Sequence, residues 1–382
     1  MRKPVYMLYR GDSRKVLATL QDKSVHCFVT SVPFYLLRGY RGRGAIGFEE
    51  TIELWAKNLV QVAAECYRVL RDDGMMVWVD GEAFYTNRSF AGPGTAAGGA
   101  FKRKHEAMGD VVARKLPRHH DLKQGDVTLQ GPYLAECLRK WGWFLRSVSI
   151  ISFTNPTPQG SGKRPVQTHQ YAIIVTKHHT NYYWDKVSSR ERGVAHDRLR
   201  RSVWEGSVEG APVFTVDGKS FKHTSIMPQW VTEICLSAAI GEKGCCPQCY
   251  AQWVPIYSKG KGGSTGSSWH PHDNDIENGN AKTTSSKDYV PPSIKGWKPG
   301  CRCGKGKETV PAIVCDPFNG IAGTGITSMN RGADYIGIDL DPRCIKASRI
   351  RLREHEKTLV LPPLFDSRKA AREQEVMFGA RD

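Results

Sequence analysis

Residues 312–325, AIVCDPFNGIAGTG, join a short apolar run to a turn of small residues and then to a stretch that can start a helix. A second apolar run, DYIGID at 334–339, follows that stretch. Small residues between a strand and a helix let the backbone approach a ligand closely, and the N-terminus of the helix adds hydrogen-bond donors. The segment therefore predicts two parallel strands joined by a helix, with a ligand at the carboxyl ends of the strands.

The chain before this segment alternates between strand and helix patterns in the same way. Residues 25–31, VHCFVTS, form an apolar run that stops before Pro33, as a buried parallel strand does. Residues 49–70 carry apolar side chains at spacings of three and four, which predicts an amphipathic helix. Further strands are expected at 75–79, 147–153 and 170–176, and a further helix near 132–141. We predict an α/β fold: a Rossmann-like, doubly wound, mostly parallel sheet with helices on both faces.

The composition is that of a large globular protein with a strong basic excess. The chain has 382 residues, with 55 Lys and Arg against 38 Asp and Glu, and a formal net charge of +17. Such an excess favours a polyanionic partner such as nucleic acid. No apolar run approaches the roughly 18 residues of a membrane span, and the N-terminal residues lack the apolar core of a signal peptide. We therefore expect no membrane partner, a cytoplasmic location, and reduced thiols for the 11 cysteines.

Three polar stretches interrupt the alternation and divide the chain. Two of them, within 87–126 and 186–222, are basic, whereas 258–300 consists mainly of small and polar residues and predicts a mobile loop. The units we expect are a first half of the sheet (1–86), a basic insert (87–126), a continuation of the sheet (127–185), a basic segment (186–222), a helix (223–244), a cysteine-containing insert (245–304), a second half of the sheet (305–357) and a tail (358–382).

The acidic residues of the glycine-rich turn indicate which ligand it binds. Asp316 begins the turn, and Asp339 ends the next strand, where a ribose diol is held in nucleotide-binding sheets. The turn lacks G-x-G-x-x-G, and Asp316 would repel a pyrophosphate. S-adenosylmethionine has no phosphate and carries an ammonium and a sulfonium, so it suits an acidic turn. A glycine-rich turn that binds no ligand is the alternative.

A second motif, TSVPFY at 30–35, stands at the end of the strand predicted at 25–31. A hydroxyl, a rigid proline and two aromatic rings make a slot for a flat ring, in which Phe34 stacks and Ser31 accepts a hydrogen bond. A plain strand-to-loop turn is the alternative. Because ligands bind at the carboxyl ends of strands in such sheets, we expect this motif to lie beside Asp316.

In order along the chain, these motifs resemble those of DNA methyltransferases that modify exocyclic amines, in the circularly permuted (beta) order. The resemblance covers roughly residues 5–355, with interruptions at 87–126 and 258–300. This chain departs from the family at Val32, where the family has proline, and at Ala322, where it has glycine. The matching segments are GDS (11–13), SVPF (31–34), IGFEE (46–50), RVL (68–70), DG (73–74), WFLRS (143–147), NPTP (155–158), RP (164–165) with His169 and Tyr171, RSVW (201–204), HTSIMP (223–228) and the run from Asp316.

The resemblance implies transfer of a methyl group from S-adenosylmethionine to the amino group of a base flipped out of double-stranded DNA. It assigns the amine to Ser31 and the carbonyl of Val32, with Pro33 restraining the loop, and stacking on the base to Phe34 or Tyr35. It assigns the cofactor to Asp316, Phe318, Gly320, Ala322 and Asp339, with Thr224 and Ser225 from the flanking segment. It also implies a bacterial or phage protein of the cytoplasm, and leaves open a homodimer and a cognate restriction enzyme.

Ser31 favours cytosine N4 as the target, because adenine enzymes of this family more often have aspartate there. Adenine N6 is the alternative within the family. Val32 and Ala322 also allow a catalytically impaired DNA-binding protein, and the charge allows an RNA methyltransferase. Valine keeps the carbonyl that the family's proline offers, so we expect an active enzyme in which Val32→Pro is tolerated.

Two cysteine pairs indicate a metal site. Cys246 and Cys249 form a C-x-x-C knuckle, and Cys301 and Cys303 form a second close pair after 51 residues. Four thiolates suit a tetrahedral structural zinc in a zinc-ribbon-like insert, with free thiols as the alternative. Similar cysteine inserts occur in relatives of the family just before the cofactor motif, so we expect this one near the cofactor domain.

The basic stretches are candidates for contacts with DNA phosphates, and a solvated surface is the alternative. We take 186–222 as the candidate segment for target recognition. The residues expected to contact DNA are Arg190, Arg192, Arg198, Arg200 and Arg201, with Lys102, Arg103 and Lys104 in the earlier insert.

Overall fold

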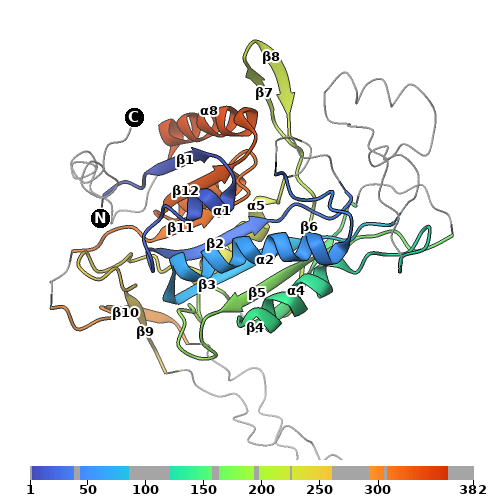
Figure 1. Cartoon of the computed structure of the whole chain (residues 1–382). Helices are drawn as coiled ribbons and strands as arrows, with labels where there is room; N and C mark the ends of the chain where they lie inside the picture. The colour runs from blue at the N-terminus through green and yellow to red at the C-terminus, as the bar shows by residue number, and fades with distance from the viewer. Residues whose placement is uncertain are drawn as a thin grey trace, which may run out of the picture.

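Eight strands form the central sheet of the computed structural model (Figure 1). The structure describes residues 2–37, 44–85, 121–156, 163–192, 198–223, 226–259, 292–304 and 308–359. Across the sheet the order is β1-β12-β11-β2-β3-β5-β4-β6. The strands are β1 (Tyr6–Arg10), β2 (Val25–Ser31), β3 (Leu70–Asp80), β4 (Phe144–Phe153), β5 (His169–Thr176), β6 (Val203–Gly206), β11 (Ile313–Asp316) and β12 (Asp334–Asp339).

The predicted mostly parallel sheet is confirmed. Neighbouring strands pair in parallel except β5, which is antiparallel to both β3 and β4. The reason lies in the connections. A helix links β3 to β4, whereas no helix of the described chain lies between β4 and β5, so these two strands form an antiparallel pair.

Helices cover both faces of the sheet, as expected. The first face packs against α1 (Ser13–Leu17), α2 (Ile52–Val69) and α4 (Gln130–Trp141), which include the labelled helices in front of the sheet in Figure 1. The second face packs against α5 (Gln229–Ala239), α7 (Gly323–Asn330) and α8 (Pro342–Thr358). Alternate residues of a buried strand serve opposite faces: Phe28 belongs to the first core and Cys27 to the second. This explains why the strands read as continuous apolar runs.

The element boundaries differ from the sequence predictions in small ways. The helix predicted at 49–70 begins at Ile52 after its cap Thr51, whose side chain accepts a hydrogen bond from the Leu54 N–H at 3.2 Å. Strands β1 and β6, at the two edges of the sheet, were not predicted, because each is short and mixes apolar with polar or charged residues. No described helix is both long enough and apolar enough to cross a lipid bilayer.

Two small hairpins lie outside the main sheet. The first, β7 (Val213–Val216) with β8 (Lys219–Lys222), falls in the basic segment 186–222 and projects beside α8 in Figure 1. Its apolar side chains pack on α8, and Asp217 pairs with Lys346 of that helix at 2.6 Å. The second, β9 (Val254–Tyr257) with β10 (Ile294–Lys298), belongs to the cysteine-containing insert.

Candidate active site

The carboxyl ends of β2, β3, β11 and β12 meet at one edge of the sheet, because these strands are parallel. They carry Ser31, Asp80, Asp316 and Asp339. The Thr30 hydroxyl donates a hydrogen bond to Asp316 Oδ1 at 2.5 Å, which joins the two predicted motifs directly. The expectation that the motifs lie side by side is therefore confirmed.

Asp316 is a buried carboxyl group bound by neutral donors. Besides Thr30, the backbone N–H of Phe318 donates to its Oδ1 at 3.0 Å, and Thr324 donates from its side chain. Burial raises the pKa of Asp316 to about 6, and these three hydrogen bonds oppose the rise. A buried carboxylate whose hydrogen-bond donors among the described residues are all neutral is suited to a cationic group.

Asp339 is the second acid of this edge and is half-buried. Its oxygens accept hydrogen bonds from the backbone N–H groups of Gly320 and Asp341, each at 2.8 Å. Burial raises the pKa of Asp339 to about 7, with Asp341 and Asp316 adding repulsion. The bond to Gly320 ties the tip of β12 to the turn after β11, so the two acids belong to one site.

The turn between β11 and α7 needs the left-handed backbone conformation at two residues. Gly320 has φ of +52°, which glycine adopts without strain. Ala322 has φ of 58° and ψ of 42° immediately before α7 and is fully buried. An L-residue in this region costs about 1 kcal/mol. Alanine at 322, where the resemblance expects glycine, therefore adds local strain to the turn.

Asn319, which the sequence analysis did not single out, anchors this turn. Its side chain accepts a hydrogen bond from the Tyr335 hydroxyl at 2.7 Å and donates to the Ser348 hydroxyl at 2.8 Å. Phe318, next to it, is half-buried, with its ring edge-on to Trp78 at 6.5 Å between centroids. An asparagine in a small-residue turn is the signal that points to such an anchor.

The loop after β2 is fixed at two backbone positions. The Val32 N–H donates to the Val79 carbonyl at 3.0 Å, and the Trp55 indole N–H donates to the Pro33 carbonyl at 2.9 Å. Proline has no N–H, so the family's residue at position 32 is unable to make the first bond. Val32 thus supplies a different restraint from the one that the family uses, and Ser31 stays half-exposed at its side.

The two aromatic residues of the loop are both buried. Tyr35 has no exposed surface, and its ring packs against Trp55 with 5.9 Å between centroids. Phe34 is 5% exposed, and its ring lies against Gly81, where an added Cβ would be 2.6 Å from a ring carbon. Only Phe34 therefore borders the edge formed by the strand ends.

Asp80 is a further site residue that sequence reasoning missed. It ends β3, is fully buried, and accepts hydrogen bonds from the Gly81 N–H at 2.9 Å and the Gln130 side chain at 3.2 Å. Burial raises the pKa of Asp80 well above its ordinary value. A single acid at the end of an apolar strand, WVD at 78–80, is the signal for it.

The structure separates the arginines of the basic segment into two groups. Arg200 donates to the backbone carbonyls of Ser189 and Arg190, which holds its guanidinium inside the segment. Arg198 and Arg201 share Glu191 at 2.8 Å and 2.7 Å, and Arg201 remains 65% exposed. Arg192 is exposed. The predicted contacts at Lys102, Arg103 and Lys104, and the cofactor residues Thr224 and Ser225, lie outside the described residues.

The four predicted metal ligands come together. The sulfur atoms of Cys246, Cys249, Cys301 and Cys303 lie within 4.8 Å of one another. Four thiols at this separation match the donor set of a tetrahedral metal site with no open position. The first pair precedes β9 and the second follows β10, so this hairpin brings together residues that are far apart in the sequence.

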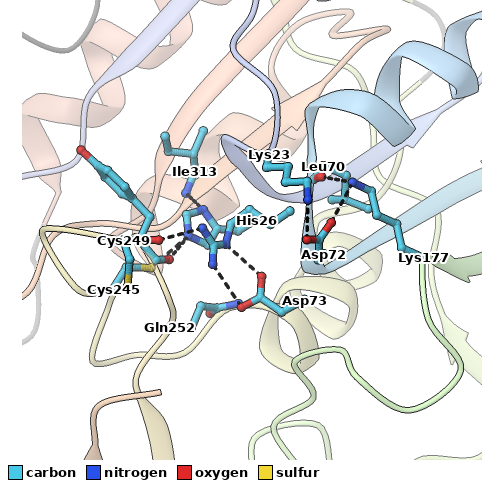
Figure 2. Close-up of polar contacts among 12 residues, drawn as sticks. Lys23, His26, Leu70, Asp72, Asp73, Lys177, Cys245, Cys249, Gln252 and Ile313 are labelled. Atoms are coloured by element: carbon cyan, nitrogen blue, oxygen red, sulfur yellow. Dashed lines mark hydrogen bonds and ion pairs between the residues drawn. The ribbon is translucent and has the colours of Figure 1, made fainter. Parts of the chain in front are cut away.

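The cysteine cluster lies at the amino-terminal ends of the central strands, whereas Asp316 and Asp339 lie at the carboxyl ends. The Arg71 side chain donates to the Cys249 carbonyl at 3.0 Å and pairs with Asp73 at 2.9 Å, both at the amino-terminal end of β3 (Figure 2). As expected, the insert contacts the cofactor half of the chain, because Cys245 and Val310, just before β11, exchange backbone hydrogen bonds, but it lies away from Asp316 and Asp339. In space, the full length of the strands separates the insert from these two acids.

His26, at the start of β2, completes this contact. Its Nδ1 accepts the Ile313 N–H at 2.9 Å, so its Nε2 carries the proton and donates to the Tyr250 carbonyl at 2.8 Å (Figure 2). The Cys245 sulfur is 3.2 Å from Nε2. Burial, with help from Arg71, lowers the pKa of His26 to about 4, so the ring is neutral. The insert is thus hydrogen-bonded to the starts of β2 and β3, and His26 connects it to the start of β11 through Ile313.

The bond between Val32 and Val79 leads to a first prediction. We expect Val32→Pro to lower the free energy of unfolding by about 1–3 kcal/mol, because the buried Val79 carbonyl loses its donor. Val32→Ile keeps the N–H and a branched side chain and serves as the control. Denaturant unfolding of the three proteins measures the difference. A Val32→Pro protein as stable as the wild type would show that the hydrogen bond is dispensable, as the family resemblance suggests.

Comparison with known proteins places the chain in a family. The sequence profile described as DNA methylase, of the N6/N4 type, matches residues 25–288, more than half of the chain. The type II methyltransferase M.Cfr9I of Citrobacter freundii is 34% identical over 200 residues, which are 52% of this chain and 63% of that protein. M.SmaI of Serratia marcescens is 28% identical over 232 residues, 60% of this chain and 73% of that protein.

Solved structures agree with the fold. The cytosine-N4-specific PvuII DNA methyltransferase has a TM-score of 0.50 at 12% identity, over 92% of this chain and 89% of that one. At this identity, the similarity shows a shared fold. The chain spans slightly less than two thirds of M.Cfr9I, and the conclusion about the family depends on the profile match. The chain belongs to the N6/N4 DNA methylase family.

Proposed function

We propose that the protein transfers a methyl group from S-adenosylmethionine to the exocyclic amine of a base flipped out of double-stranded DNA, cytosine N4 being the target. The observation that carries this proposal is the contact between Thr30 and Asp316, which joins the cofactor turn to the Ser31–Phe34 loop. Membership of the N6/N4 family and the type II methyltransferases among its relatives support DNA as the substrate.

The residues at the strand ends fit S-adenosylmethionine. Asp316 offers a buried carboxylate that would pair with the ammonium group, and Asp339 would accept hydrogen bonds from the ribose hydroxyls. Phe318 would line the adenosine pocket. When bound, the cofactor supplies a methyl group activated by the positive charge on its sulfur.

The Ser31–Phe34 loop would orient the amine. The amino nitrogen of a base is a poor nucleophile, because its lone pair is delocalised into the ring. Hydrogen bonds from the two amino hydrogens to Ser31 Oγ and the Val32 carbonyl would turn the lone pair toward the methyl group. The bonds at Val32 and Pro33 hold these acceptors in place, so that orientation provides much of the acceleration. Phe34, which borders the strand edge, would stack on the base, whereas Tyr35 is covered by Trp55.

The other parts of the proposal concern the metal and the DNA contacts. The four-cysteine cluster would hold one structural zinc, because four thiolates leave no position for water.

Among the arginines, Arg192, Arg198 and Arg201 would contact phosphates, together with Arg190, whereas Arg200 would support the segment from within. A homodimer and a cognate restriction enzyme stay predictions.

The cofactor proposal predicts an effect of both acids and of pH. Asp339→Ala and Asp316→Ala should each weaken S-adenosylmethionine binding by about 1.5–3 kcal/mol, as for a lost charge-assisted hydrogen bond. A protonated Asp316 is neutral and does not pair with an ammonium. Affinity should therefore rise as pH increases through about 6 and should lose this dependence in Asp316→Ala. Calorimetry measures both effects, and unchanged affinity in both variants would contradict the assignment.

The catalytic proposal predicts the product and the effect of Ser31. Ser31→Ala should lower turnover by about 100-fold or more, the scale of losing one preorganised hydrogen-bonding group. Ser24→Ala, which changes the serine immediately before the other end of the same strand, is the control. Labelled methyl transfer to duplex DNA and to RNA, followed by nucleoside analysis, measures the outcome. Methyladenine in place of methylcytosine would favour the N6 alternative, label in RNA alone would favour an RNA substrate, and no label would favour a DNA-binding role.

The metal proposal predicts one zinc per chain. Protein purified without chelator should contain one equivalent, and Cys301→Ser with Cys303→Ser should abolish it. Cys137→Ser, which removes a half-buried thiol of α4 away from the cluster, should leave it unchanged. Because Arg71 and His26 bind the insert to the sheet, loss of zinc should also lower the thermal midpoint. Elemental analysis that finds no zinc would reject the site.

A further inference from the structure

Two carboxyl groups that have no role in the proposed methyl transfer lie at the carboxyl end of β3. Asp80 is fully buried, and Glu82 is half-buried two residues later. Asp80 Oδ1 accepts two hydrogen bonds, but Asp80 Oδ2 and Glu82 Oε1 are buried without a hydrogen-bond partner in the part of the chain that the structure describes. Burying an oxygen of this kind is costly, so each is a candidate to bind a proton or a donor.

Asp80 is held against the Ser31–Phe34 loop from both sides. The residue before it, Val79, accepts the hydrogen bond of the Val32 N–H. The residue after it, Gly81, lies in contact with the Phe34 ring. The backbone on either side of Asp80 therefore touches the loop that would hold the target amine.

The surroundings favour a single negative charge on the two groups. Burial raises the pKa of both, and Glu82 raises that of Asp80 further by repulsion. Glu82 also accepts the backbone N–H groups of Leu129 and Gln130 at the N-terminus of α4, and the Thr128 hydroxyl at 3.4 Å. These donors and the helix dipole stabilise the charge on Glu82. Gln130 contacts both groups, its side chain at Asp80 and its backbone at Glu82, so the two carboxyl groups are neighbours that together favour one proton.

A polar path leads from Glu82 to half-exposed surface. Tyr171 of β5 stands opposite Asp80 in the sheet, and its hydroxyl faces Glu82. The same hydroxyl lies 3.3 Å from His169 Nε2, two residues earlier on the same face of the strand. His169 is half-exposed. Gly131 of α4 makes room for the Tyr171 ring, where a Cβ would collide with it.

We propose that Asp80 and Glu82 accept the proton released by methylation of the amine and pass it through Tyr171 to His169 and then to water. This inference rests on the proposed function. In the transfer, the amine lone pair forms the new bond to the methyl carbon, and the carbon–sulfur bond returns its electrons to sulfur. The nitrogen then carries a positive charge and loses one proton to the carboxylate pair. Tyr171 accepts a proton from the pair as it gives its own to His169, so it ends the step neutral.

Few titratable or polar groups of the described residues face the proton path from Asp80 to His169. Asp80 meets Glu82 and Gln130, and Glu82 meets Thr128, Gln130 and Tyr171. His169 additionally meets the Gln167 side chain. A structural role for Tyr171 would affect folding or binding, whereas a relay role affects the dependence of the rate on pH and on external bases.

Single-turnover methyl transfer to duplex DNA, measured from about pH 5.5 to 9 with saturating cofactor, tests the relay. Asp80→Asn should slow transfer by about 100-fold and should remove the acid limb of the pH profile. Tyr171→Phe and His169→Gln should each slow it about tenfold, and concentrated imidazole buffer should restore much of the rate, because an external base replaces the path. Tyr133→Phe, a tyrosine of α4 outside the path, should match the wild type.

Two results would overturn the relay. One is an Asp80→Asn protein, folded by circular dichroism, that transfers methyl at the wild-type rate with the wild-type pH profile. The other is a Tyr171→Phe protein whose loss is a weaker affinity for DNA or cofactor and does not respond to imidazole. If the wild type itself transfers no methyl group, the proposed function fails and the relay fails with it. If the wild type is active and these variants match it, only the relay fails.

Discussion

Parallel pairing of β2 with β11 on one side and β3 on the other is the constraint on which the site depends. Because all three strands run in the same direction, their last residues meet at one edge. Thr30 then reaches Asp316, and Val32 reaches Val79. An antiparallel β2 would carry the Ser31–Phe34 loop to the other edge of the sheet, away from both acids. The two motifs form one site only because this arrangement brings them together.

The acids at this edge are held by dipoles. Asp316 and Asp339 accept hydrogen bonds from hydroxyls and backbone N–H groups, and burial raises the pKa of both. The chain carries a net charge of +17, so cations are abundant elsewhere in it. Keeping two carboxyl groups buried with raised pKa values costs folding stability, which is typical of sites that bind a charged ligand. The strained Ala322 before α7 adds to the same cost.

The two ends of the strands have different physical characters. The amino-terminal ends carry His26 and Arg71, whose partners are backbone carbonyls of the cysteine insert, and this edge is closed by specific hydrogen bonds (Figure 2). The carboxyl ends carry acids with raised pKa values and buried oxygens, such as Asp80 Oδ2, that have no hydrogen-bond partner among the described residues. An insert docked at the first edge strengthens the sheet without obstructing the second.

The sequence alone determined the fold class, most of the central strands and the two motifs, because apolar periodicity and turn chemistry are local properties. It also identified the four cysteines. Tertiary structure decided which neighbours those residues have. It showed that the Val32 N–H donates to the Val79 carbonyl, that Tyr35 is covered by Trp55, and that Arg200 binds its own segment. It also distinguished Asp80 from the other acids, since burial and the partners of a side chain come from residues distant in the chain. A pattern of spacing contains no information about such contacts.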